Sequence, residues 1–284
     1  MSFIVKLVSA LFVFLSTSLL VFAEDTKITA YFFNDSVNGF QFSDAYETHN
    51  MGLRFEKENV FYQIDLGIVT PDMFEYENRY RTANRSFGEL ITLAYGKNAL
   101  FTNQDLSLDF VTKITSQGNF GISGLQSIIH QFANFQDDID LLETVRMPSQ
   151  TWVGVGTDLK LLKNDISQKH HFGLLSYVGT DRLSSQPYVH VEYNVGSWSQ
   201  FGRLGVDFVF YDNIISATPI EATIREVRPV MSFGFNKKFG PLEISISENL
   251  SLPSIATDDR LYARLFMSAS MSLEKLVELF PLKY

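Results

Sequence analysis

The chain has 284 residues, a formal net charge of −9 at pH 7 and no cysteine. The negative charge argues against a nucleic-acid partner, because such a partner favours a basic surface. The absence of cysteine excludes a disulfide framework and a lipid anchor on a cysteine. It also suits a protein that is exported to an oxidising compartment.

The first 23 residues have the pattern of a secretion signal. Lys6 provides a positive charge, residues 7–22 are almost wholly apolar, and Ala23 supplies a small residue at the cleavage position. We therefore predict a signal peptide over 1–23 and a mature chain over 24–284. An uncleaved membrane anchor is the alternative, because the apolar run approaches the length that spans a bilayer. No later window reaches 18 continuous apolar residues, so the sequence predicts no further transmembrane helix.

Several segments of the mature chain alternate between polar and apolar residues with a period of two. The clearest are 188–195, 203–210 and 241–248. In the first, His190 shares one face with Tyr188, Glu192 and Asn194, and valines dominate the other. Repeated alternation of this kind is typical of the strands of a membrane β-barrel, apolar toward lipid and polar toward the lumen.

Counting such segments predicts an all-β fold, a transmembrane antiparallel β-barrel of about twelve strands that occupies 24–284. The predicted strands are 26–34, 49–57, 60–69, 87–97, 104–116, 151–162, 171–180, 187–196, 200–212, 226–237, 241–250 and 260–273. Tight turns are expected at 56–59, 196–199 and 237–241. Longer connections are expected at 35–48, 70–86, 117–150, 181–186, 213–225 and 251–259. Short periplasmic turns and long outer loops are usual in such barrels.

The longest loop contains a segment with helical spacing. Residues 123–135 carry an apolar stripe on one side, while Gln126, His130 and Asn134 follow at i, i+4 and i+8 on another. A short helix at the rim of the barrel would bring His130 to the wall. Alternatively, the helix lies on the lipid surface, which would leave His130 without a chemical role.

The adjacent residues Asn34 and Asp35 stand where the first predicted strand gives way to a loop. An amide and a carboxylate at this point can hold a hard cation or orient a reacting group. The competing interpretation is an ordinary turn, because Asn and Asp often cap backbone groups at strand ends.

Five segments together resemble the lipid A 3'-O-deacylases of bacterial outer membranes. They are Phe33-Asn-Asp-Ser36, Ser43 to Phe55, Gly67-Ile-Val-Thr-Pro-Asp72, Asn84-Arg-Ser-Phe-Gly88 and Gly118 to His130. The resemblance is sharp between about 30 and 135, and from 150 onward only the barrel pattern continues. It implies a twelve-stranded barrel that uses calcium and has its active site at the outer-leaflet end.

The same resemblance implies roles for individual residues. Asn34 and Asp35 fall on the family's Asn-Asp pair, His130 on its essential histidine and Gln126 on the glutamine one turn earlier. Thr48 or Asn50 can fill the role of a threonine that precedes the glycine of the second-strand motif. The implied reaction is hydrolysis of the 3'-linked acyl ester of lipid A, with His130 as general base. Asp35 and Asn34 would bind Ca²⁺.

Two functions from other classes stay open at this point. A non-enzymatic barrel, either a small pore or a structural protein, needs none of these residues. A calcium-assisted outer-membrane phospholipase would act on glycerophospholipid instead of lipopolysaccharide. In each case the partners are outer-membrane lipids, and the sequence leaves the oligomeric state open.

Overall fold

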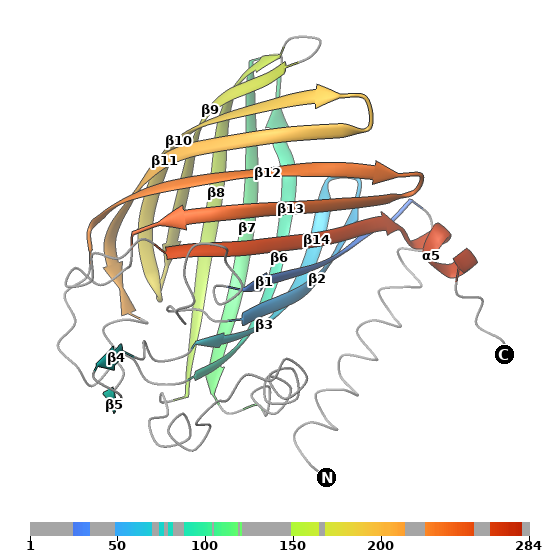
Figure 1. Cartoon of the computed structure of the whole chain (residues 1–284). Coiled ribbons are helices and arrows are strands. Elements are labelled where there is room, and N and C mark those ends of the chain that lie inside the picture. The colour runs from blue at the N-terminus through green and yellow to red at the C-terminus, as the bar shows by residue number, and fades with distance from the viewer. Residues whose placement is uncertain are drawn as a thin grey trace, which may run out of the picture.

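In the computed structural model the chain forms a closed antiparallel barrel (Figure 1). The structure describes residues 25–34, 49–69, 74–76, 79–81, 88–103, 105–118, 120, 149–164, 168–213, 225–252 and 262–279. The barrel strands are β1 (Lys27–Asn34), β2 (His49–Lys57), β3 (Val60–Val69), β6 (Gly88–Thr102), β7 (Leu106–Gly118), β8 (Gln150–Asn164), β9 (Gln168–Gly179), β10 (Arg182–Val195), β11 (Trp198–Asp212), β12 (Val227–Phe239), β13 (Leu242–Ser251) and β14 (Tyr262–Ser272).

Each strand pairs with its neighbours in sequence, and the barrel closes where β1 pairs with β14. Twelve strands take part, as the period-two segments predict. A separate hairpin, β4 (Phe74–Tyr76) with β5 (Arg79–Arg81), interrupts the connection between β3 and β6. The helix α5 (Leu273–Leu279) follows the last strand. Within the described ranges no helix is long and apolar enough to cross a membrane.

The two faces of the wall differ in the manner that the alternation predicts. In β11, Leu204 is 61% exposed and Phe210 is 67% exposed, whereas Asp207 between them is 6% exposed. The apolar residues therefore point outward and the charged residue points into the lumen. The predicted orientation of His190 is also confirmed, because its ring stacks on His171 from the paired strand inside the barrel.

Tight turns gather at one end of the barrel, which we call the turn end; α5 lies at this end too (Figure 1). Glu58 and Asn59 join β2 to β3 with φ values of 50° and 67°, the conformation of a two-residue hairpin that matches strand twist. Gly196 and Gly240 supply positive φ in two further turns. The opposite end, where β1 stops at Asn34, is the loop end.

One predicted connection is wrong. The expected connection over 181–186 is almost entirely strand, because β10 begins at Arg182. Pro187 lies inside β10, where the pairing to β11 skips Gln186 and Pro187, so the missing N–H of the proline costs no ladder bond there. Strand β9 starts at Gln168, three residues before the predicted start at 171, so His170 and His171 both belong to it.

Large aromatic rings inside the barrel lie over glycines of the adjacent strand. A Cβ at the glycine would collide with the ring in each case, so the glycine is required for this close approach. Each ring can thereby extend sideways across the paired strand that contains the glycine. The directly paired examples are Tyr31 over Gly52, Phe61 over Gly96, Tyr188 over Gly173 and Phe201 over Gly234.

Candidate functional site

The end of β1 is held by neighbouring strands on both sides. Asn34 pairs with His49 of β2 and with Leu265 of β14. Two ladders fix the backbone at Asn34, so a site built there has a rigid base. Asp35, the next residue, lies outside the described part of the chain.

A continuous row of paired residues runs from Asn34 along the loop end of the wall. We call it the rim row: it passes from Asn34 through His49, Ile68 and Glu89 to Gly118, the last residue of β7. The connection from β7 to β8, which contains residues 126 and 130, starts directly after Gly118. The rim row therefore joins the Asn34 position to the start of the longest loop, with four strand steps of together about 19 Å between them.

Glu89 shows how that loop begins. Alternation along β6 places Glu89 on the same outward face as Leu93, whose side chain is 51% exposed. Glu89 is nevertheless fully buried. The backbone N–H of Phe120 donates a hydrogen bond to its carboxylate. The ring of Phe120 also lies close to Gly118, where a Cβ would be 3.2 Å from Cζ. Phe120, two residues after the end of β7, therefore lies against the outward-facing carboxylate of Glu89 in the rim row.

A second polar group lies on the lumen side of the same strands. Gln63 donates to the carboxylate of Asp65 at 2.9 Å, and the ring of Tyr31 lies beside Asp65 over Gly52. The hydroxyls of Thr92 and Thr115 are 2.9 Å apart on the neighbouring pair of strands. These side chains brace the inside of the wall under the rim row. We did not single out Asp65 or Glu89 from the sequence, although alternation in β3 and β6 predicts which face each one occupies.

The sequence-predicted site residues are only partly within the described chain. Asn34 is described as the last residue of β1, and Asn50, the alternative to Thr48, pairs with Phe33 and Gly67. The remaining candidates, Asp35, Thr48, Gln126 and His130, lie outside the described residues. Among the residues that are described, no group of three His, Cys, Asp or Glu side chains is arranged to hold a metal ion.

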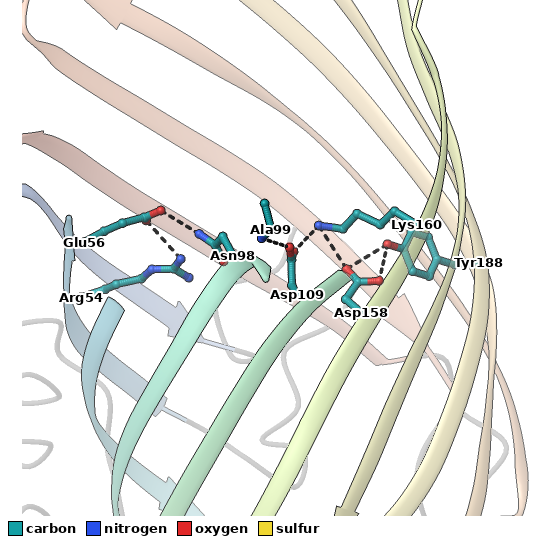
Figure 2. Close-up of polar contacts among 8 residues, drawn as sticks. All are labelled: Arg54, Glu56, Asn98, Ala99, Asp109, Asp158, Lys160 and Tyr188. Atoms are coloured by element: carbon teal, nitrogen blue, oxygen red, sulfur yellow. Dashed lines mark hydrogen bonds and ion pairs between the residues drawn. The ribbon is translucent and has the colours of Figure 1, made fainter. Parts of the chain in front are cut away.

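A different network lies on the lumen side of the wall, in the half of the barrel near the turn end (Figure 2). We call it the lower network, where lower means nearer to the turn end than the rim row is. Lys160 forms ion pairs with Asp109 and, at 3.5 Å, with Asp158. The hydroxyl of Tyr188 donates to Asp158 at 2.8 Å, and the guanidinium of Arg203 lies 3.6 Å from the centre of the Tyr188 ring. Side chains of β7, β8, β10 and β11 are therefore linked to one another inside the barrel.

The lower network continues in both directions around the wall. On one side Asn98 donates to Glu56 at 2.7 Å, and Glu56 also accepts from Arg54 at 3.1 Å (Figure 2). On the other side the rings of His171 and His190 stack with centroids 4.7 Å apart. Charged and aromatic side chains thus line the lumen side of the wall at this level and contact one another from strand to strand.

A closed antiparallel barrel with an apolar outer face and a charged interior is the architecture of transmembrane β-barrel proteins. No protein-family model and no curated protein match the chain in sequence. Among solved structures it is similar to LpxR from Salmonella typhimurium, a lipid A 3'-O-deacylase, with a TM-score of 0.72 and 13% identity. That match covers 87% of this chain and 100% of LpxR.

Two porins have lower scores. The NanC porin gives a TM-score of 0.47 at 7% identity and the KdgM porin 0.45 at 6%; each match covers 87% of this chain, and 100% and 99% of the respective porin. At 13% identity the likeness to LpxR concerns the fold. The resemblance stated from the sequence motifs is confirmed at that level.

Proposed function

We propose that this protein is a calcium-dependent lipid A 3'-O-deacylase of the outer membrane. It would hydrolyse the ester that joins the 3'-acyl or acyloxyacyl chain to lipid A. The observation that carries the proposal is the rim row, because it runs from Asn34 to Gly118, and Phe120 shortly afterwards donates a hydrogen bond to Glu89 of the same row. The fold shared with LpxR supports the same function.

The dimensions allow the two halves of the proposed site to meet. A helix over 123–135 would be about 20 Å long, at 1.5 Å per residue. The four strand steps from β7 back to β1 amount to about 19 Å. A helix that starts near Gly118 and follows the outer wall would therefore bring Gln126 and His130 toward Asn34.

The chemistry assigned to each residue follows from its side chain. His130 would take a proton from the attacking water, since histidine is the side chain that ordinarily titrates near neutral pH. Gln126, one helical turn earlier, would orient the imidazole or the substrate carbonyl. Asn34 would position the water or donate a hydrogen bond to the oxygen that gains negative charge. Thr48 or Asn50 would complete the polar surroundings.

Asp35 and Asn34 would hold the calcium ion. A carboxylate and an amide carbonyl are among the oxygen ligands that Ca²⁺ prefers, and its flexible coordination leaves positions for backbone and substrate oxygens. When bound, the ion would stabilise negative charge on the ester carbonyl oxygen.

The apolar outer face supports a location in the outer membrane after cleavage of residues 1–23. The first strand then runs from the turn end in the periplasm to the loop end at the cell surface. Lipopolysaccharide, whose lipid A anchors the outer leaflet, would reach the rim row from the membrane. The outward position of Glu89 and Phe120 supports an approach from outside the barrel instead of through its lumen.

The lower network argues against the pore hypothesis. Lys160, Asp109, Asp158, Tyr188 and Arg203 neutralise or stack on one another inside the barrel, where a pore requires an aqueous path. Side chains interlocked in this way on the lumen side suit a protein whose function lies at its rim.

Mass spectrometry of lipid A from cells that express the protein tests the proposal. We expect loss of the 3'-linked chain, no loss with His130→Ala, and no loss when calcium is chelated during an assay of the purified protein. His170→Ala, a histidine of β9 near the turn end, is the matched control and should retain activity. An unchanged lipid A spectrum from well-folded protein would overturn the proposal. Release of fatty acid from glycerophospholipid alone would favour the phospholipase.

A further inference from the structure

Glu248 is a carboxylate on the outer face of the barrel wall. In β13 the neighbouring residue Ser247 faces the lumen, 7% exposed and beside Gly234, so alternation directs Glu248 outward. Glu248 pairs with Phe233 of β12 and with Leu265 of β14. The outward side chains around it are all apolar: Met231, Phe233, Ile246, Leu250, Leu265 and Met267.

This carboxylate is not satisfied by the described chain. Its Oε1 atom is shielded from solvent and has no hydrogen-bond partner among the described residues, and no described basic side chain forms an ion pair with it. A carboxylate on a lipid-facing wall is costly unless it finds hydrogen-bond donors or a counter-charge. Its surroundings therefore call for donors supplied from outside the barrel.

Glu248 lies on the extension of the rim row. The pairing runs from Glu248 to Leu265 and from Leu265 to Asn34, two strand steps of together about 10 Å. On the other side of Asn34 the same row contains Glu89, whose carboxylate the chain's own Phe120 satisfies. The row thus has an acidic residue on each side of Asn34, and only Glu89 has a donor within the described residues.

We propose that Glu248 is a substrate-contacting residue that accepts hydrogen bonds from the hydroxyl or amide groups of the lipid A glucosamine. The inference rests on the proposed function, because it requires the 3'-ester to lie at Asn34. With the ester there, the sugar carrying it would cover β14 and β13, where Glu248 meets it. Acyl chains offer no donors, so they can satisfy only the apolar neighbours. One carboxylate alone is too few ligands for a calcium ion.

Two substitutions and a matched control test this contact. Glu248→Leu removes the acceptor, whereas Glu248→Gln keeps an acceptor oxygen without the charge. Glu243→Gln makes the same change on the same strand near the turn end, at the carboxylate that pairs with Lys27 at 3.1 Å. The full chain in detergent micelles would be assayed for kcat and KM on lipid A, and separately for binding of lipid A, phosphatidylethanolamine and phosphatidylglycerol.

We expect Glu248→Leu to raise KM at least fivefold with kcat within twofold, Glu248→Gln to have a smaller effect, and Glu243→Gln none. Lipid A binding should weaken in parallel, while binding of the two glycerophospholipids stays unchanged. Because binding is measured without turnover, weaker lipid A binding in an inactive protein would support the contact while refuting the enzyme. An active enzyme with wild-type KM in Glu248→Leu would overturn the contact alone. Equal weakening for phosphatidylethanolamine would overturn the assignment to the sugar.

Discussion

The hydroxyl of Tyr188 donates to the carboxylate of Asp158 at 2.8 Å although the two residues are on strands that do not touch. Strand β9 lies between them, and the ring reaches across it at Gly173, where no side chain stands in its path. One glycine therefore permits a hydrogen bond that links β10 to β8. Figure 2 shows this bond as part of the line of contacts that extends to Arg54.

Tyr188→Phe should lower the free energy of unfolding by about 1–2 kcal/mol, because it removes a donor to a charged acceptor in a shielded place. Asp158 would keep only its 3.5 Å ion pair with Lys160. Urea unfolding, followed by the gel mobility of the folded barrel, measures the change. Tyr95→Phe is the control, since Tyr95 is 42% exposed on the outer face. Equal stability of both variants would show that the Tyr188 hydroxyl contributes nothing.

Gly173→Ala should cost more, about 1–3 kcal/mol, because the new methyl group would overlap the Tyr188 ring and displace it from Asp158. Gly202→Ala provides the matched control, because a Cβ there meets no atom within 4 Å. The same unfolding measurement compares the two. If Gly173→Ala were as stable as Gly202→Ala, the ring would not depend on the glycine.

Purified protein in a planar bilayer should show no steady ion conductance. The lower network places ion-paired and hydrogen-bonded side chains on the lumen side of the wall, and we expect them to obstruct an aqueous path. The double substitution Lys160→Ala, Tyr188→Ala removes the two largest side chains that converge on Asp158 and should raise the frequency of conducting events. Stable conductance of the unmodified protein would favour the pore after all.

Glu89→Ala should loosen the start of the loop that follows β7, because Phe120 loses the acceptor of its N–H. Residues 119–149 contain a single trypsin site, Arg146. We expect cleavage there to accelerate several-fold and lipid A deacylation to fall about tenfold, in the range of a lost positioning interaction.

The controls for this prediction separate the hydrogen bond from the charge. Glu89→Gln retains an acceptor oxygen and should resemble the wild type more closely than Glu89→Ala. Thr112→Ala, on the outward face of β7, tests for a general effect of changing that surface. Unaltered cleavage at Arg146 in Glu89→Ala would mean that this contact does not hold the loop.

Most of the barrel could be predicted from sequence because lipid on one side and a polar lumen on the other impose strict alternation. Strands β2 and β3 begin and end where the alternation does, at 49–57 and 60–69. The error at 181–186 has a physical origin, because Ser184, Ser185 and Pro187 are residues typical of loops. In the structure they pair with residues of β9, which extends far enough along the wall to continue the ladder to them.

The site was less accessible to prediction than the fold. Motif resemblance predicts roles for Asn34 and His130, but neither composition nor spacing could reveal that Glu89 is buried and bound by the backbone N–H of Phe120. Such a contact depends on where a loop returns, and a single sequence does not contain this information. The lumen network escaped notice for a similar reason, since Tyr188 reaches Asp158 only through the absence of a side chain at Gly173.

Closure of the barrel by β1 and β14 has a consequence for its biogenesis. Every other ladder joins strands that are adjacent along the barrel part of the chain and can form as a local hairpin. The final seam requires Lys27 to meet Ser272, from the first and last strands of the barrel. Until the last strand has been exported, β1 presents an open edge that can pair with other chains. The amount of protein that reaches the membrane should therefore depend on how well that edge is protected before β14 pairs with it.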